Sequence, residues 1–156
     1  MGLWDGIEDA ELFERGVYLK PGFIGTVEVE RTIVKRTRAI GDAFIVEMRV
    51  IETNMPKDED HPVGQKVSWF QKLADKDIAF PAIKAWAAAC AGYKMSQKDE
   101  IDEDVSPVLK DMMELATDKP DANDFIGIRL HVETVQIKTK NNKDFTRHNW
   151  DPISLH

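Results

Sequence analysis

Positively charged side chains gather in two stretches of an otherwise acidic sequence. The chain has 28 acidic and 21 basic residues, which gives a formal net charge of −7. The two basic stretches contain Arg31, Lys35, Arg36 and Arg38, and then Lys138, Lys140, Lys143 and Arg147. Local clusters of charge decide where an anion binds, whatever the sum for the whole chain. We therefore expect an anion-binding surface near these stretches, although lysines at surface turns also serve solubility alone.

A second group of side chains could provide flat faces for stacking. Phe70 alternates with Ser68 and Lys72 on the polar side of a short run, and a phenylalanine beside a lysine suits the stacking of nucleobases. The alternative is that Phe70 packs under the N-terminal segment. Trp150 is equally compatible with stacking and with packing at a sheet edge. The candidate nucleic-acid-binding residues are Lys35, Arg36, Arg38, Arg49, Phe70, Lys72, Lys138, Lys140, Lys143, Arg147 and Trp150.

Carboxylates on the same strands would limit how much of this surface can bind an anion. Glu47 shares the polar side of its strand with Arg49, and Glu28 and Glu30 hold the polar side of the strand before it. Cross-strand ion pairs between these glutamates and arginines would reduce binding across the whole sheet.

The elements that must position these residues follow from the spacing of apolar residues. Alternation predicts two long strands within 25–54, joined by a turn at Gly41–Asp42, with Val27, Val29 and Ile33 on one side of the first. Further strands are predicted at 65–72, 125–139 and 144–150, with a turn over 140–143. The apolar parity switches near Glu133–Thr134, which predicts a bulge or a sharp bend there. Helices are predicted at 78–91 and from Ser106–Pro107, with an acidic, mobile linker at 94–105.

The order of three strands, two helices and two strands predicts a mainly β protein with helices. It is the order of the OB-fold, a closed or partly open five-stranded antiparallel barrel with helices between strands three and four. This fold binds single strands on strands two and three, flanked by the 1–2 and 4–5 loops. We expect a single OB-fold-like domain over 1–156, with a leader at 1–22 containing a short helix that ends near Gly16.

A resemblance supports this expectation. The stretches LKPGFIGTVEV, GDAFIVEMRVIET and HPVGQKVSWF resemble phage-encoded single-stranded-DNA-binding proteins of replication and recombination modules, in layout and not in a diagnostic motif. The resemblance implies sequence-tolerant binding of single-stranded DNA beside replication or recombination proteins, in the host cytoplasm. Many such proteins end in an acidic tail, whereas this sequence ends WDPISLH and carries its acidic run at Asp99–Asp104.

Other classes of function are less well supported. The four histidines lack metal-ligand spacing, no phosphate-binding glycine loop occurs, and the only cysteine, Cys90, lies in an alanine-rich run as a buried thiol would. We expect no enzyme, no metal and no cofactor. The alternatives are a structural or protein-interaction β-barrel and, third, a metal-dependent nuclease. Without a membrane span or signal peptide we expect a cytoplasmic protein, and a homo-oligomer is left open.

Overall fold

The computed structural model describes the chain except residues 1–2, 4–16, 38–40, 56–59, 140–141 and 154–156. The predicted helix before Gly16 therefore lies outside the described residues. The elements are β1 (Ile24–Thr37), β2 (Gly41–Thr53), β3 (Lys66–Lys72), α1 (Lys76–Cys90), α2 (Lys98–Asp104), α3 (Ser106–Asp118), β4 (Arg129–Lys138) and β5 (Asp144–Pro152).

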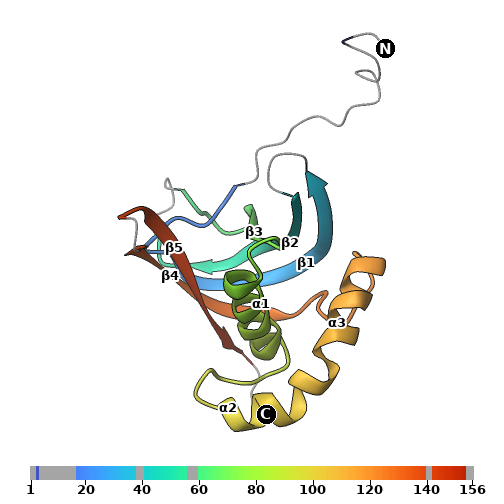
Figure 1. Ribbon diagram of the computed structural model, residues 1–156. Helices are drawn as coiled ribbons and strands as arrows, with labels where there is room; N and C mark the ends of the chain where they lie inside the picture. Colours follow the sequence, from blue (N-terminus) through green and yellow to red (C-terminus); the bar gives the residue numbers. More distant parts are fainter. Residues whose placement is uncertain (1–2, 4–16, 38–40, 56–59, 140–141, 154–156) are drawn as a thin grey trace.

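The five strands form one antiparallel sheet in the order β3-β2-β1-β4-β5. Residues of β4 pair with β1, so the C-terminal hairpin belongs to the same sheet as the first hairpin, as predicted. The sheet is strongly curved, and β3 and β5 are its two edges (Figure 1). The sequence predicted a closed or partly open barrel. No hydrogen-bonded ladder joins β3 to β5 among the described residues, so the sheet is not closed, and the strand pairing alone does not establish a barrel.

A bulge at Glu30 sets which residues of β1 face the core. Val29 lies opposite Met48, but Arg31 lies opposite Glu47, so Glu30 is the extra residue on β1. The bulge reverses the alternation, which buries Thr32 and turns Ile33 to the outer face. The prediction that Ile33 shares a side with Val27 and Val29 is wrong for this reason.

The β4–β5 ladder, in contrast, is continuous from Leu130–Pro152 to Lys138–Asp144. Of the two alternatives predicted near Glu133–Thr134, a bulge or a sharp bend, the bulge is therefore absent from this ladder. The parity switch in the sequence has another cause, because Thr134 occupies the core side. Its hydroxyl donates to the Lys20 carbonyl and accepts the Phe23 N–H. A buried hydroxyl with partners on both sides replaces an aliphatic residue without a large penalty.

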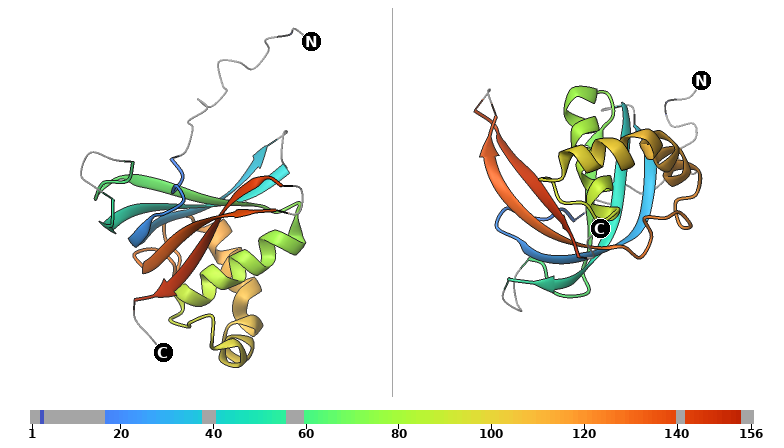
Figure 2. Two further views of the ribbon diagram at one scale, coloured as in Figure 1. Left: turned by 90° about the vertical axis from the view of Figure 1, so that its left-hand side faces the viewer. Right: turned by 90° about the horizontal axis from the view of Figure 1, so that it is seen from below.

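The three helices lie on the inner face of the curved sheet, as Figure 2 shows from two sides. α1 starts at Lys76, two residues before its predicted start, and its alanines allow close packing on the sheet. Trp86 is fully buried there, with its ring centroid 4.5 Å from that of Phe125 and 5.6 Å from that of Phe44. The helices cover one face only, so the outer face of β1, β2 and β3 is not covered by helices (Figure 2).

The acidic run is not the mobile linker that the sequence predicted. Residues 98–104 form α2, whose Ile101 is buried with Val105 and Ala88. The spacing of Ile101 and Val105 places both on one side of a helix, so their burial opposes the repulsion among the acidic side chains. Asp102 accepts a hydrogen bond from the Lys84 Nζ at 3.0 Å, which lowers the pKa of that carboxyl.

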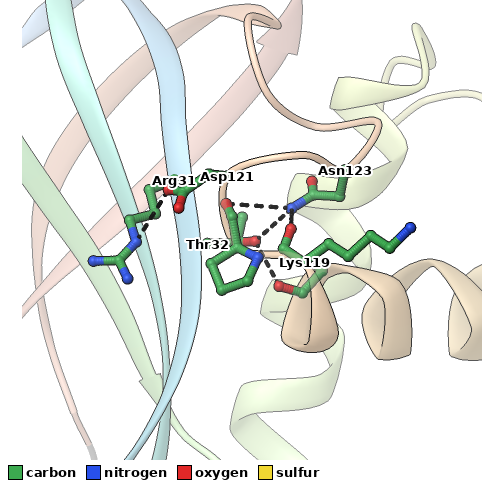
Figure 3. A network of polar contacts seen from close by, with 7 residues as sticks. Arg31, Thr32, Lys119, Asp121 and Asn123 are labelled. Carbon is green, nitrogen blue, oxygen red and sulfur yellow. Dashed lines mark hydrogen bonds and ion pairs between the residues drawn. The ribbon is translucent and has the colours of Figure 1, made fainter.

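Polar contacts attach the segment after α3 to β1 beside the bulge (Figure 3). The Asn123 amide donates to the Thr32 hydroxyl at 3.0 Å and to the Lys119 carbonyl at 2.7 Å. Thr32 in turn donates to the Ala116 carbonyl, and Arg31 pairs with Asp121 at 3.3 Å. Arg31, part of the first basic stretch, therefore lies beside a carboxylate, and an exposed ion pair of this kind adds little to stability.

Candidate nucleic-acid interface

The outer face of β1, β2 and β3 carries side chains in rows that cross the strands, because the register aligns them. The row beside the β1–β2 turn consists of Lys35, Ala43 and Lys72, and both lysines are exposed. The next row consists of Ile33, Ile45 and Phe70. A further row, at the far end, consists of Arg129, Glu28, Arg49 and Lys66. The face therefore changes from cationic through apolar to mixed charge along the strands.

The mixed row is held together by ion pairs. Arg49 lies 3.5 Å from Glu28 and 3.4 Å from Glu30, and Arg129 lies 3.1 Å from the other oxygen of Glu28. The sequence predicted such cross-strand pairs between glutamates and arginines, and the prediction is confirmed. Arg49 was also a candidate for binding nucleic acid, but its guanidinium is already shared between two carboxylates.

Phe70 is half-buried on the outer face and has an aromatic neighbour from the N-terminal segment. The rings of Tyr18 and Phe70 lie 5.4 Å apart, and Tyr18 is 48% exposed. Tyr18 is placed there because the Ser68 N–H donates to the Val17 carbonyl along the edge of β3. Phe70 thus packs against the N-terminal segment, which was one of the two interpretations of the sequence. The Tyr18–Phe70 pair nevertheless retains an exposed aromatic surface. Sequence reasoning missed Tyr18, which stands outside any regular element.

The cations of the first hairpin lie beside this pair. Lys72 is exposed and makes no ion pair with a described residue, and Ala43 separates it from Lys35. The spacing of neighbouring strands puts the two backbones about 10 Å apart. Arg36 is nearly fully exposed and lies 3.7 Å from Asp42. Arg38 falls outside the described residues.

The second hairpin carries the other cations. Lys138, Lys143 and Arg147 are all exposed, and none of them pairs with a carboxylate of a described residue. At the described ends of the predicted turn, Asn142 has a φ of 59° and the Thr139 N–H donates to the Lys143 carbonyl. Lys140 falls outside the described residues. The turn ends of the two hairpins point to the same side of the molecule, with the start of α1 between them (Figure 2).

The space between the edges of β3 and β5 is a seam, which we define as the hollow lined by Trp69, Gln71, Phe145, Thr146, His148 and Trp150. Two adjoining cavities of about 420 and 500 Å³ occupy it. Trp150 is only 4% exposed, and its ring lies 5.2 Å from that of Trp69. The expectation that Trp150 offers an open face for stacking is therefore not supported, because Trp69 and His148 cover it.

His148 stacks on Trp150 with ring centroids 5.5 Å apart. Burial lowers the pKa of His148 to about 4, and a hydrogen bond to the Thr146 carbonyl opposes this shift in part. The imidazole is therefore neutral at pH 7. Its Nε2 is buried and has no hydrogen-bond partner among the described residues.

Outside this region, a groove of about 880 Å³ lies between α1 and α3, lined mainly by apolar side chains such as Val34, Phe80 and Met113. Within the described part of the chain, no group of three or more His, Cys, Asp or Glu side chains could hold a metal ion. Cys90 is packed against the core, and burial raises the pKa of its thiol well above the ordinary value. It is therefore not an activated nucleophile.

A scan against models of protein families finds no match to this chain, and a search of curated proteins finds none. No helix among the described residues is long and apolar enough to cross a membrane.

Proposed function

We propose that this protein binds single-stranded DNA with little sequence preference, on the outer face of β2 and β3. The observation that carries the proposal is the position of the Tyr18–Phe70 pair next to Lys72, an exposed cation without a carboxylate partner among the described residues. Aromatic faces bind bases of any sequence and nearby cations bind the phosphates, which together make a platform for single strands.

The strand order supports an OB-fold as the scaffold for this function. In that fold the first strand is shared by two hairpins, and strands three and five meet to close the barrel. Here β1 lies between β2 and β4, and the facing edges β3 and β5 approach each other through Trp69 and Trp150. We infer a partly open barrel in which both basic hairpins flank the binding face.

Replacing three unpaired cations tests the proposal. In the K72A/K143A/R147A variant, affinity for an oligo-dT strand should fall by about tenfold or more at 0.1 M salt. The plot of log affinity against log salt should become shallower by about 2, since each phosphate contact on a single strand contributes about 0.7. Tryptophan fluorescence titrations at several salt concentrations measure both quantities.

The matched control removes three exposed lysines from the helical side, as K94A/K98A/K119A, with the same change in net charge. This control should leave the salt dependence of oligo-dT binding unchanged. Equal losses in both variants would show that only net charge matters. If the parent protein fails to bind oligo-dT at low salt, the proposal is wrong and the protein-interaction alternative gains support.

A further inference from the structure

A second exposed aromatic side chain lies across the seam from Phe70. Phe145 is 41% exposed and belongs to β5, the strand that borders the seam opposite β3. Phe70 and Phe145 both line the seam cavity of about 420 Å³, together with Tyr18. The seam therefore has aromatic side chains on both of its sides, one set from each edge strand.

The alternation along β5 places Phe145 on the outer face of the sheet. Phe145 lies opposite Ile137 of β4, and Arg147 lies on the same side of β5 two residues further on. Trp150 lies on the other side of the strand, where it is buried in the core under the helices. Phe145 and Arg147 thus belong to the same outer face of the sheet as Phe70.

Exposed cations lie on both sides of Phe145 along the chain. Lys143 precedes it by two residues and Arg147 follows it by two, and both side chains are exposed. Phe70 and Lys72 have the same spacing on β3. An aromatic face with a cation beside it binds one base and its neighbouring phosphate, so β5 repeats the arrangement that β3 offers.

We propose that the bound single strand continues from the Tyr18–Phe70 pair across the seam to β5, where one of its bases stacks on Phe145. This inference rests on the proposed function, because it extends the path of the same strand beyond β3. Lys143 and Arg147 contact the phosphates on either side of that base.

Carboxylates at the seam limit where the phosphates of the strand can lie. Asp75 lines one seam cavity and Asp151 lines the other, and each would repel a phosphate placed in the seam. The strand therefore crosses with its phosphates toward solvent, beside the exposed cations, and with its bases toward the aromatic side chains. Stacking does not depend on the identity of the base, so the crossing preserves binding of any sequence.

Substitutions that remove or keep the aromatic ring of Phe145 test the proposal. F145L should bind an oligo-dT strand of about 16 nucleotides about tenfold more weakly than wild type, which corresponds to one base–aromatic contact. F145Y should bind this strand as wild type does. Leucine keeps an apolar side chain opposite Ile137, so the hairpin is retained in both variants. An abasic strand of the same length, which has the phosphates but not the bases, should bind all three proteins equally.

The matched control is F80L, at an exposed phenylalanine of α1 that also lies beside a lysine. The Lys76 Nζ is 5.8 Å from the centroid of the Phe80 ring, and Phe80 lines the groove between α1 and α3, not the seam. F80L should bind oligo-dT as wild type does. Equal losses in F145L and F80L, or an equal loss of F145L on the abasic strand, would contradict stacking on Phe145.

Photocrosslinking of the unmodified protein gives a second measurement that needs no variant to fold. 5-Iododeoxyuridine is placed at successive positions of the strand, and crosslinks should form at Tyr18 or Phe70 from some positions and at Phe145 from others. If the protein binds oligo-dT but every position crosslinks only to Tyr18 and Phe70, or if F145L binds as wild type, the crossing is overturned while the proposed function stands. If oligo-dT does not bind the wild-type protein, both fail.

Discussion

The two ends of the outer sheet face have similar cationic side chains, but different groups surround them. At the far end, Arg49 and Arg129 are held by Glu28 and Glu30 at 3.1 to 3.5 Å. At the turn end and along β5, Lys72, Lys143 and Arg147 are exposed and have no carboxylate partner among the described residues. The arginines of the far end are paired within the fold, whereas Lys72, Lys143 and Arg147 keep their charges exposed to solvent.

This difference shows why counting basic residues is a poor guide to a binding surface. A guanidinium shared by two carboxylates attracts a phosphate less than its formal charge suggests, since the local field is nearly neutral. A lysine beside an alanine and an aromatic pair keeps its full charge. The exposed cations are solvated, but the buried Nε2 of His148 in the seam has no partner among the described residues and should cost the folded protein some stability.

The largest expected effect is at His148, whose buried imidazole should make the fold sensitive to acid. Its folded pKa of about 4 lies below the ordinary 6.5, so the unfolded chain takes up the proton first as the pH falls. The contribution to stability is therefore intact above pH 6.5 and is lost progressively between pH 6.5 and 4. The shift corresponds to a loss of about 3 kcal/mol at most. Urea unfolding at pH 7 and pH 4.5 measures it.

H148F is the comparison for this prediction, because phenylalanine keeps the stacking on Trp150 and cannot be protonated. Between pH 7 and pH 4.5 the free energy of unfolding should fall less in H148F than in wild type. The difference between the two decreases should be most of the loss expected from His148. Carboxylates titrate in both proteins, so only the difference between them reports on His148. Parallel curves for the two proteins would contradict the assignment of a buried, neutral imidazole.

Much of the fold was predictable from local patterns. Alternation located all five strands, and Asn142 in the second turn has the positive φ that its residue type allows. The turn predicted at Gly41–Asp42 was placed too late, because both residues belong to β2 and pair with Thr37 and Arg36 of β1. Two features were not predictable. The bulge at Glu30 depends on how β2 pairs with β1, and the helix at 98–104 depends on the burial of Ile101 against α1, so both arise from tertiary contacts.

The candidate site was predictable in part. Sequence periodicity placed Phe70 and Lys72 on the outer side of β3, where the structure has them. It could not identify Tyr18 as the partner of Phe70, because that contact depends on an irregular segment lying along a strand edge. Periodicity also could not predict whether Trp150 is exposed. Its ring is covered by Trp69 from β3 and by His148 from its own strand, β5.

A smaller effect on stability and on oligo-dT binding is expected when the carboxylates that pair with Arg49 at the far end are removed. The E28Q/E30Q variant removes the carboxylates that hold Arg49 and should lower the free energy of unfolding by about 1 kcal/mol, as exposed ion pairs contribute little. Oligo-dT binding should tighten a few-fold, because Arg49 becomes available. Thermal unfolding and fluorescence titration measure the two effects.

A second substitution shows whether pairing with Glu28 and Glu30 is what keeps Arg49 from binding the oligonucleotide. R49A in the wild-type background should leave the salt dependence of oligo-dT binding unchanged, while R49A added to E28Q/E30Q should make it shallower by about 0.7. If R49A has the same effect in both backgrounds, the glutamates do not withhold this arginine, and the contrast between the two ends is not one of pairing.

The smallest effect is expected from the acidic helix α2, and it tests how far the contrast extends. Asp99, Glu100 and Glu103 are exposed on α2, which lies on the helical side of the molecule, away from the hairpin turns (Figure 1). Three other carboxylates lie close to the cations of the turn end. Asp42 is the partner of Arg36, Asp75 lines the same cavity as Lys72, and Asp144 is the cross-strand neighbour of Lys138.

Replacing either set by asparagine or glutamine changes the net charge by three. At 0.1 M salt, charges separated by more than about 10 Å are screened, so the set beside the cations should tighten oligo-dT binding several-fold and the α2 set by less than twofold. Equal tightening by both sets would mean that the field of the whole protein governs binding, and then α2 could compete with DNA for the basic hairpins despite its distance. Unequal tightening would mean that only charges near the turn end affect the affinity for oligo-dT.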